Sequence, residues 1–239
     1  MEIAILLASG MGTRMHPITE TTPKPLVKVN GKPMIETIID ALNYRGVEKI
    51  VIVVGYLENQ FYYLKEQYPN IEIVKNDMYE TINNISSVYC AKEYLLEGNC
   101  FICEADLYVS DLSVLKNPLS ESCYFGKMVE GYSPDWVFEQ DQNGFITRVG
   151  KGGNNLYNMT GIAFLRRNEA KILYNAIISD WRKAGYEKLF WDDVVNNHIK
   201  EFKLKVHPIE RHQIIEIDTV EELKKVRSSI ICENHDVKS

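Results

Sequence analysis

The sequence predicts an α/β fold of the Rossmann-like type: a mixed, mostly parallel sheet flanked by helices, with a small β insertion over the substrate site. In the first hundred residues, short apolar runs alternate with longer amphipathic stretches. This order implies right-handed crossovers between parallel strands. The second half instead carries short β candidates separated by turn-rich pieces. The length of 239 residues, 45% of them apolar, suits one large domain with a continuous buried core.

The first half is expected to alternate strands and helices from its first residues. Glu2–Ala8 is apolar nearly throughout and short, as a buried strand is. A glycine-bearing loop follows. Pro33 then opens a helix whose apolar residues recur at three- and four-residue steps, and Gly46 ends it. The next expected elements are a strand at Lys49–Val54, a helix at Phe61–Tyr68, a strand at Ile71–Val74, a helix at Ser86–Leu96 and a strand at Cys100–Glu104.

The second half is expected to begin with β structure and to end with a helix. Thr219 and Glu222 form a capping box, which marks the start of that last helix. Residues 231–239 form a polar tail, of which Glu233 to Ser239 are expected to fray. The expected strands are Tyr124–Val129, Trp136–Glu139, Phe145–Val149, Thr160–Leu165, Lys203–His207 and Gln213–Ile217, and the expected helices are Glu169–Trp181 and Lys188–Ile199.

Composition excludes several classes of partner. The 27 Lys and Arg residues against 33 Asp and Glu residues give a net charge of −6, which offers no electrostatic attraction to nucleic acid or to an anionic membrane. No apolar run approaches the ~20 residues that cross a bilayer, and the N-terminus lacks the basic start of a secretory signal. Five cysteines spread through apparent core segments favour a reducing, cytoplasmic location.

The loop after the first strand carries the strongest chemical signal. Two glycines two residues apart, Gly10 and Gly12, let backbone N–H groups approach and cradle phosphate oxygens. Arg14 and Lys24 would add charge-assisted contacts. Met15 stands where a dinucleotide fingerprint requires a third glycine, and no Walker spacing follows. From these residues alone, an ordinary strand-to-helix turn remains the alternative.

The longer string adds a resemblance to a known family. Leu-x-x-Gly-x-Gly-Thr-Arg-x-x-Pro-x-Thr, followed by Pro-Lys-Pro-Leu, closely resembles the signature of the nucleotidyltransferases that act on sugar and alcohol phosphates. The string departs from that signature at Ser9 and Met15, where alanine and leucine are usual. The resemblance implies a nucleotidyltransferase fold in which Gly10 to Arg14 wrap a triphosphate and Lys24 contacts the reacting phosphates.

Two acidic residues are candidate metal ligands. Asp106 follows the predicted strand Cys100–Glu104, and Asp218 immediately precedes the capped helix. Open α/β sheets bind ligands at the carboxyl ends of their strands, and Mg²⁺ held by carboxylates neutralises phosphate charge. Opening a loop and interacting with a helix N-terminus are the alternative roles. The family resemblance implies that Asp106 and Asp218 hold Mg²⁺.

Further motifs narrow the resemblance. The Glu-Lys-Pro motif of sugar-1-phosphate enzymes is missing from the comparable region, Arg148–Gly153. Together with the loop, five short motifs resemble those of the bacterial CTP:phosphocholine cytidylyltransferases, and the resemblance extends over nearly the whole chain. The motifs are Gly55-Tyr56, Asn83–Ser87, Pro134–Trp136, Leu189–Asp193 and Glu216–Asp218. The residues that this resemblance assigns to the nucleotide are Ala8, Ser9, Gly10, Met11, Gly12, Thr13, Tyr56, Asn84, Ser86 and Glu104, with the cytosine near Ser9, Asn84 and Ser86. The residues that it assigns to an amine pocket are Trp136, Phe190, Asp192 and Glu216.

The chemistry of an amine pocket is consistent with these residue types. A quaternary ammonium has no N–H to donate, so aromatic faces and diffuse negative charge hold it. Core packing is the alternative role for Trp136 and Phe190, and it is the expected one for Trp191. Phe190 stands where a tyrosine is associated with the phosphocholine enzymes, which leaves an aminoethyl group open as the ligand.

The sequence therefore predicts an enzyme that transfers CMP from CTP to a small aminoalkyl phosphate, phosphocholine first, releasing pyrophosphate. Arg14 and Lys24 would stabilise the charge on the reacting phosphates. The alternatives are a 2-aminoethylphosphonate cytidylyltransferase, a sugar-1-phosphate nucleotidylyltransferase and a non-catalytic nucleotide-binding module. We expect a single domain over residues 1–230, with a nucleotide-binding half of about 1–110 and an acceptor-binding half of about 111–230. A homodimer and a fusion to another domain both stay open.

Overall fold

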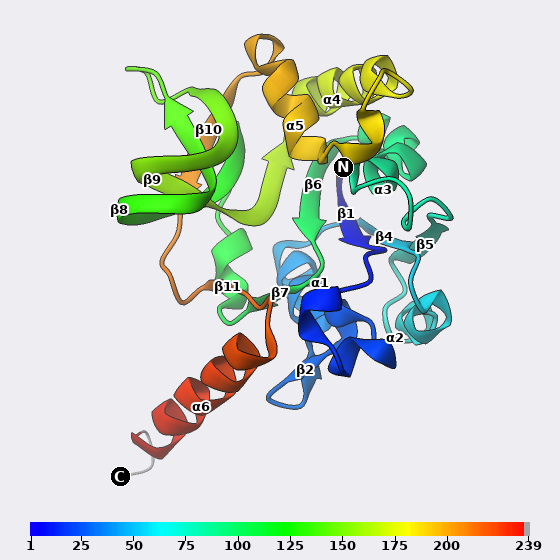
Figure 1. Cartoon of the computed structure of the whole chain (residues 1–239), viewed down its shortest axis with the longest axis vertical. Coiled ribbons are helices and arrows are strands. Elements are labelled where there is room, and N and C mark those ends of the chain that lie inside the picture. Colours follow the sequence, from blue (N-terminus) through cyan, green and yellow to red (C-terminus); the bar gives the residue numbers. More distant parts are fainter. Residues whose placement is uncertain (237–239) are drawn as a thin grey trace.

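A seven-stranded sheet runs through the computed structural model, which describes residues 1–236 and the side chains of residues 1–228 (Figure 1). Its strands, in spatial order, are β10 (Leu204–Pro208), β8 (Ser122–Gln140), β9 (Ile146–Leu165), β6 (Asn99–Glu104), β1 (Glu2–Ala8), β4 (Lys49–Val54) and β5 (Ile71–Lys75). Two small ribbons pair β2 (Lys28–Val29) with β3 (Lys32–Pro33) and β7 (Leu107–Val109) with β11 (Ile214–Glu216).

The sheet is mixed and mostly parallel, as the sequence predicts. β1 lies between β4 and β6 and runs parallel to both, and β5 runs parallel to β4. β9 pairs antiparallel with β6 and β8, while β10 is parallel to β8. The carboxyl ends of β1, β4 and β6 therefore meet at one edge, where folds of this kind bind their ligands.

Helices cover both faces of the sheet. They are α1 (Met34–Arg45), α2 (Tyr63–Gln67), α3 (Ile85–Cys90), α4 (Arg167–Asp180), α5 (Trp191–Asn197) and α6 (Val220–Asp236). Short 3₁₀ segments lie at Thr13–Met15, Ile18–Glu20, Lys24–Leu26, Glu58–Phe61, Lys92–Leu96, Leu112–Leu115, Tyr186–Lys188 and Ile199–Glu201.

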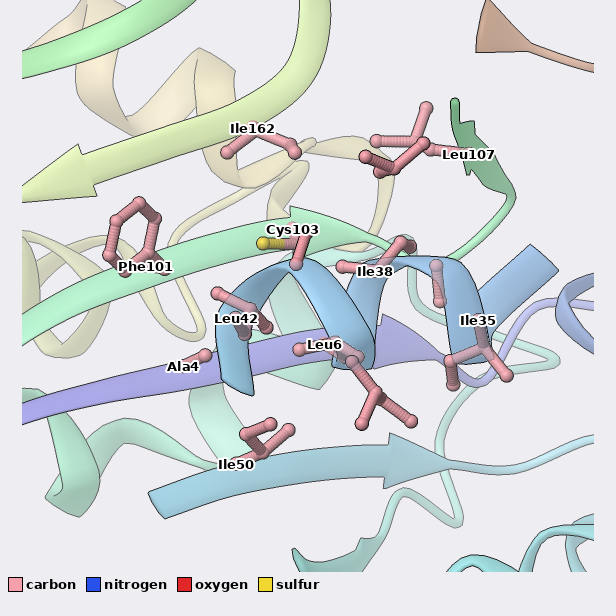
Figure 2. Packing of buried hydrophobic residues seen from close by; sticks show 14 of the residues in the cluster. Ala4, Leu6, Ile35, Ile38, Leu42, Ile50, Phe101, Cys103, Leu107 and Ile162 are labelled. Atoms are coloured by element: carbon pink, nitrogen blue, oxygen red, sulfur yellow. The ribbon is translucent and has the colours of Figure 1, made fainter. Parts of the chain in front are cut away.

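Alternate residues of β1 belong to two different hydrophobic cores. Ala4 and Leu6 face α1, while Ile3 and Ile5 face α3, α4 and α5. Figure 2 shows the first of these cores, with side chains from β1, β4 and β6 beneath α1. Each large side chain that is fully buried in this way contributes about 1.5–3 kcal/mol to stability. The two cores fix the sheet edge that carries the site.

The last helix begins where its capping box predicts. The Thr219 hydroxyl accepts from the backbone N–H of Glu222 at 3.2 Å, and the Glu222 carboxylate accepts from the N–H groups of Thr219 and Asp218 at 2.9 and 2.8 Å. Leu223 packs with residues of the β2–β3 ribbon, and the helix then points away from the body (Figure 1). The cap therefore fixes the backbone of Asp218.

Several predicted boundaries were wrong. The β candidates between Tyr124 and Leu165 are parts of two long strands, β8 and β9, which pair through repeated bulges. The helix predicted at Ser86–Leu96 is α3 followed by a 3₁₀ segment. The helices predicted at Phe61–Tyr68 and Lys188–Ile199 are the shorter α2 and α5, each with an adjoining 3₁₀ segment at one end. Glu233 to Asp236, where fraying is expected, form the end of α6, and residues 237–239 lie outside the described residues.

The lengths of the helices and the positions of the cysteines bear on the expectations drawn from composition. No helix among the described residues is long and apolar enough to cross a membrane. Cys90, Cys100, Cys103 and Cys123 are free thiols, and the last three are buried. Burial raises the pKa of the Cys103 thiol and of the Cys100 thiol well above the ordinary value, as expected for core cysteines rather than metal ligands.

Candidate active site

A cleft of about 550 Å³ opens at the carboxyl ends of β1 and β6, between the β8–β9 hairpin and the start of α5. It joins segments that are far apart in the chain: the loop after β1, the start of α3, the hairpin, α5 and the stretch after β11. The lining residues include Ala8, Ser9, Gly10, Gly12, Thr13, Arg14, Lys24, Asn84, Ser86, Glu104, Asp106, Trp136, Phe190, Asp192, Glu216 and Asp218, all of which the sequence singled out.

The glycine loop brings the backbone close to Lys24. Gly12 has a left-handed φ of 62°, and a Cβ there would lie 2.8 Å from the Lys24 Cβ. The Gly12 carbonyl accepts from the Thr19 hydroxyl at 2.8 Å and from the Met15 N–H at 3.0 Å. Glycine is therefore required here for both the backbone conformation and the close packing.

Lys24 links the two candidate metal ligands. Its ammonium donates to Asp106 and to Asp218 at 2.6 Å each, and only 5% of the residue is exposed. Arg14, which is largely exposed, donates to Asp218 at 2.8 Å. Burial alone lowers the pKa of Lys24, but the two carboxylates outweigh it and hold that pKa above its ordinary value.

The donor set fits a magnesium ion shared with a nucleotide. Asp106 and Asp218 meet on one ammonium, so a cation is already accommodated between them. Mg²⁺ is commonly bound by one or two carboxylates together with substrate phosphates. Among the described residues, no cluster of three or more acidic, His or Cys side chains forms a complete protein cage. This pair therefore suits a metal that arrives with phosphate ligands.

An aromatic pair also lines the cleft. The rings of Trp136 and Phe190 lie edge to face with centroids 5.7 Å apart. The ammonium of Lys151 lies 5.8 Å from each centroid, within the range of a cation–π interaction. Lys151 has no carboxylate partner in the described part of the chain. The pair therefore already contacts one primary ammonium.

Carboxyl groups surround the centre of the cleft. Asp192 is 4% exposed and accepts from the Tyr124 hydroxyl at 3.0 Å, and burial raises its pKa to about 7. Burial first, and then the charge of Asp106, raise the pKa of Glu104 well above its usual range. Desolvation by the surrounding protein first, and then the charges of Asp106 and Asp218, raise the pKa of Glu216 as well, although part of its side chain is exposed to solvent. These carboxyl groups therefore favour the binding of protons or cations in the cleft.

Asn84 connects the two sides of the cleft. Its side-chain oxygen accepts from the backbone N–H of Trp191 at 2.9 Å, and its amide nitrogen donates to Glu104 at 3.0 Å. Trp191 itself is 3% exposed and packs in the core, as predicted. The Asn84 side chain thus holds the start of α5 against the nucleotide side of the cleft.

Two predicted site residues do not line the cleft. Met11 is 40% exposed on the glycine loop. The Tyr56 hydroxyl instead donates to the carbonyls of Thr19 and Glu20, at 2.9 and 3.2 Å, so the side chain supports the segment after the loop.

Sequence reasoning also missed residues. Lys151 and Asp135 line the cleft, and Asn76 lies buried directly behind Ser9. Asp135 was named from the sequence only within the motif Pro134–Trp136. Lys151 lies in the region Arg148–Gly153, which was named only because it lacks the Glu-Lys-Pro motif. Asn76 follows the β5 strand, and a polar residue at a strand end was the available signal for it.

Comparison with known proteins is consistent with this geometry. Residues 4–122 match the family model described as a MobA-like NTP transferase domain. A 2-aminoethylphosphonate cytidylyltransferase of Lancefieldella rimae is 52% identical over 92% of this chain and 89% of its own length. A choline-phosphate cytidylyltransferase of Streptococcus pneumoniae is 36% identical, over 97% and 99% of the two chains. The solved structure of a CTP:phosphocholine cytidylyltransferase from that organism superposes with a TM-score of 0.88 at 34% identity, covering 96% and 99%.

The fold is therefore that of a nucleotidyltransferase, and the chain is an enzyme of that class. Within it, the chain belongs to the bacterial cytidylyltransferase family that includes these choline-phosphate and 2-aminoethylphosphonate enzymes. The non-catalytic alternative has no support, since the matched relatives are named as enzymes.

Proposed function

We propose that this enzyme transfers CMP from CTP to 2-aminoethylphosphonate, with release of pyrophosphate. The observation that carries the proposal is the 52% identity, over 92% of the chain, to a relative with that named activity. This acceptor was the sequence-based alternative, and it now replaces phosphocholine as the first choice. A cytoplasmic location stays a prediction from the cysteines.

The acceptor end of the cleft supports a primary ammonium. Such a group donates three hydrogen bonds and therefore needs oxygen acceptors besides aromatic faces. Asp135 is exposed beside Trp136 and makes no ion pair with any described residue; it accepts only from Asn158 at 3.3 Å. The aromatic pair already contacts the ammonium of Lys151. We assign the aminoethyl ammonium to Asp135 and this pair, with Asp192 and Glu216 adding negative charge.

The free ammonium of Lys151 complements the other end of the acceptor. Arg14 and Lys24 are both paired with carboxylates, whereas Lys151 contacts only aromatic rings in the part of the chain that the structure describes. When the acceptor ammonium takes the aromatic pair, Lys151 is released and can bind the phosphonate. One carboxylate and one ammonium then match a zwitterionic acceptor.

The reaction needs no protein nucleophile. A phosphonate oxygen attacks the α-phosphorus of CTP, a new P–O bond forms, and the bond from the α-phosphorus to the pyrophosphate oxygen breaks. Arg14 and Lys24 stabilise the charge on the reacting phosphates, and the glycine loop orients the triphosphate. Mg²⁺ bound by Asp106 and Asp218 would supply further neutralisation of phosphate charge.

Pyrophosphate release with CTP and Mg²⁺ tests this proposal. The acceptors are 2-aminoethylphosphonate, phosphocholine, phosphoethanolamine and glucose-1-phosphate. We expect the highest kcat/KM with the phosphonate. Preference for phosphocholine would instead support the second candidate, which the 36% identity to a choline-phosphate enzyme and the aromatic pair favour. No release with any of the four would refute both acceptors.

The variant Asp135→Asn tests the ammonium site. It keeps the side-chain shape but removes the charge, so the KM for 2-aminoethylphosphonate should rise about ten-fold while the KM for CTP stays unchanged. Asp77→Asn is the matched control, because Asp77 is an exposed carboxylate outside the cleft lining. An unchanged acceptor KM in Asp135→Asn would remove Asp135 from the site.

A further inference from the structure

A closed polar cluster lies behind the wall of the cleft. Asn76, directly after β5, is fully buried, and its side chain lies among the hydroxyls of Ser9, Ser86 and Ser87. Within this cluster, Ser9 is the residue that directly follows β1; it adjoins the glycine loop and lines the cleft. The hydrogen bonds in the cluster determine what Ser9 presents to a ligand.

The orientation of the Asn76 amide is fixed by a backbone donor. The Met78 N–H can only donate, and it lies 2.9 Å from Asn76 Oδ1. The amide nitrogen therefore faces the serines, at 2.9 Å from Ser86 Oγ and 3.2 Å from Ser87 Oγ. Both serine oxygens therefore accept hydrogen bonds from Asn76, and Ser9 Oγ accepts a longer one at 3.4 Å.

The proton of Ser86 is also committed. Its hydroxyl donates to the Asn83 carbonyl at 2.8 Å, with the Ile82 carbonyl at 3.2 Å. A carbonyl only accepts, so this direction is not reversible. Ser86 therefore presents no free donor to the cleft.

Ser87 can place its proton in one direction. The residue is 1% exposed, and buried hydroxyls are paired. Its oxygen already accepts from Asn76, and among the described residues the remaining partner is Ser9 Oγ, 2.7 Å away. Ser87 therefore donates to Ser9. The opposite direction would leave the Ser87 proton buried and unpaired.

We propose that Asn76 is a positioning residue that makes Ser9 a hydrogen-bond donor toward the cytosine ring of CTP. Ser9 accepts from Ser87, so its own proton points into the cleft that it lines. The N3 and O2 atoms of cytosine accept hydrogen bonds, whereas N3 of uracil carries a proton and donates. A fixed donor at Ser9 that faces N3 therefore favours CTP over UTP, whereas a donor that faced O2, which both bases carry, would not distinguish them. This inference rests on the proposed function and on the cytosine lying near Ser9, as the family resemblance implies.

Asn76→Asp reverses the relay with almost no change in shape. At pH 8 the carboxylate that the variant carries accepts a hydrogen bond from the Ser87 hydroxyl. Ser9 then donates its own hydrogen bond to Ser87, and it presents only lone pairs to the base. We measure dissociation constants for CTP and UTP by calorimetry with Mg²⁺ and without acceptor, so that no turnover occurs. The ratio of CTP to UTP affinity should fall about ten-fold or more in the variant.

Further variants separate direction from packing. Ser9→Ala removes the terminal donor and should lower the same ratio, and Asn76→Asp should then have no further effect on it. Ser87→Ala removes the hydroxyl that donates to Ser9 and leaves only the longer contact with Asn76 at 3.4 Å, so it should also lower the ratio. Thr81→Ala is the control: the Thr81 hydroxyl donates to the Met78 carbonyl outside the cluster and does not line the cleft, so the preference for CTP should persist.

The outcomes divide clearly. Equal loss of CTP and UTP affinity in Asn76→Asp, or a loss that persists on the Ser9→Ala background, would overturn the inference. If Asn76→Asp does not fold, the single variants decide: Ser9→Ala and Ser87→Ala must lower the preference for CTP and Thr81→Ala must keep it, and an unchanged preference in Ser9→Ala and Ser87→Ala refutes the relay. If the wild-type enzyme does not prefer CTP, the proposed nucleotide fails instead.

Discussion

Lys24 acts on both charge and stability because its ammonium joins two carboxylates at 2.6 Å each. In Lys24→Met, Asp106 and Asp218 would face each other without a counter-charge. We expect the free energy of unfolding without metal to fall by about 3 kcal/mol and kcat to fall at least about 100-fold. Added Mg²⁺ should raise the melting temperature of the variant more than that of the wild-type enzyme, because the metal replaces the lost cation.

The matched control for this variant is Lys28→Met. Lys28 is an exposed lysine on β2, so the same loss of charge occurs away from the cleft. Its stability, its response to Mg²⁺ and its kcat should remain those of the wild-type enzyme. If Lys24→Met kept most of its activity, Lys24 would have no part in stabilising the reacting phosphates.

Asp192 should make folding stability depend on pH. Its pKa is raised to about 7 in the folded enzyme, from an ordinary value near 4. Between these values the folded state binds a proton that the unfolded chain releases, so this contribution is present at pH 4 and is lost as the pH rises through 7. The difference between a pKa near 4 and a pKa of about 7 corresponds to about 4 kcal/mol of folding free energy.

Asp192→Asn tests this dependence. The amide can still accept from the Tyr124 hydroxyl but does not ionise. Urea unfolding at pH 5 and pH 8 should show a smaller loss of stability in the variant than in the wild-type enzyme, and the variant should be the more stable protein at pH 8. Asp77→Asn, at an exposed carboxylate, should keep the wild-type slope. Identical slopes for wild type and Asp192→Asn would place no proton on Asp192.

The glycine loop depends on two glycines in different ways. A Cβ on Gly12 would meet Lys24 at 2.8 Å and sit on a left-handed backbone, whereas a Cβ on Gly10 has no atom within 4 Å. Gly12→Ala should therefore cost about 1–3 kcal/mol of stability and displace Lys24, while Gly10→Ala should leave the melting temperature unchanged. Equal melting temperatures for the two variants would show that the loop relaxes around the added methyl group.

Apolar runs and capping residues in the sequence correctly predicted the strands and the helix start that they mark. Apolar runs at Glu2–Ala8 and Lys49–Val54 are strands, and the box of Thr219 and Glu222 caps α6. The same signals failed in the β8–β9 hairpin. The predicted strands Tyr124–Val129 and Trp136–Glu139 are parts of the single strand β8, which contains Gly131 with its left-handed φ and has register shifts near Trp136.

The site divides in the same way. Residues carried by contiguous motifs, such as Lys24 and Asp106, were assigned from their resemblance to a family and do meet in one cleft. Lys151 enters through long-range packing of the hairpin, for which the sequence carries no periodicity or spacing signal. The sequence marks Asn76 only as a polar residue at the end of a strand, and its contacts with the serines depend on long-range packing. Tyr56 shows the converse, because a motif residue can support a loop from outside the cleft.

At the scale of the whole molecule, one sheet joins the two predicted halves. β9 pairs with β6 across the boundary near residue 110, and Asn84 donates to Glu104 while it accepts from Trp191. Separating the halves would expose the edge of β6 and both cores, so neither half is expected to be stable alone.

Thermal unfolding should accordingly be a single cooperative transition. All three tryptophans lie in the second half, at positions 136, 181 and 191, so their fluorescence reports that half, whereas far-ultraviolet circular dichroism reports the whole chain. We expect the two midpoints to coincide, and to move together to higher temperature with CTP and Mg²⁺, because ligand that binds only the folded cleft stabilises both halves at once. A fluorescence midpoint several degrees from the dichroism midpoint would show that the acceptor half unfolds separately, and the cleft would then be an interface between two domains rather than part of one.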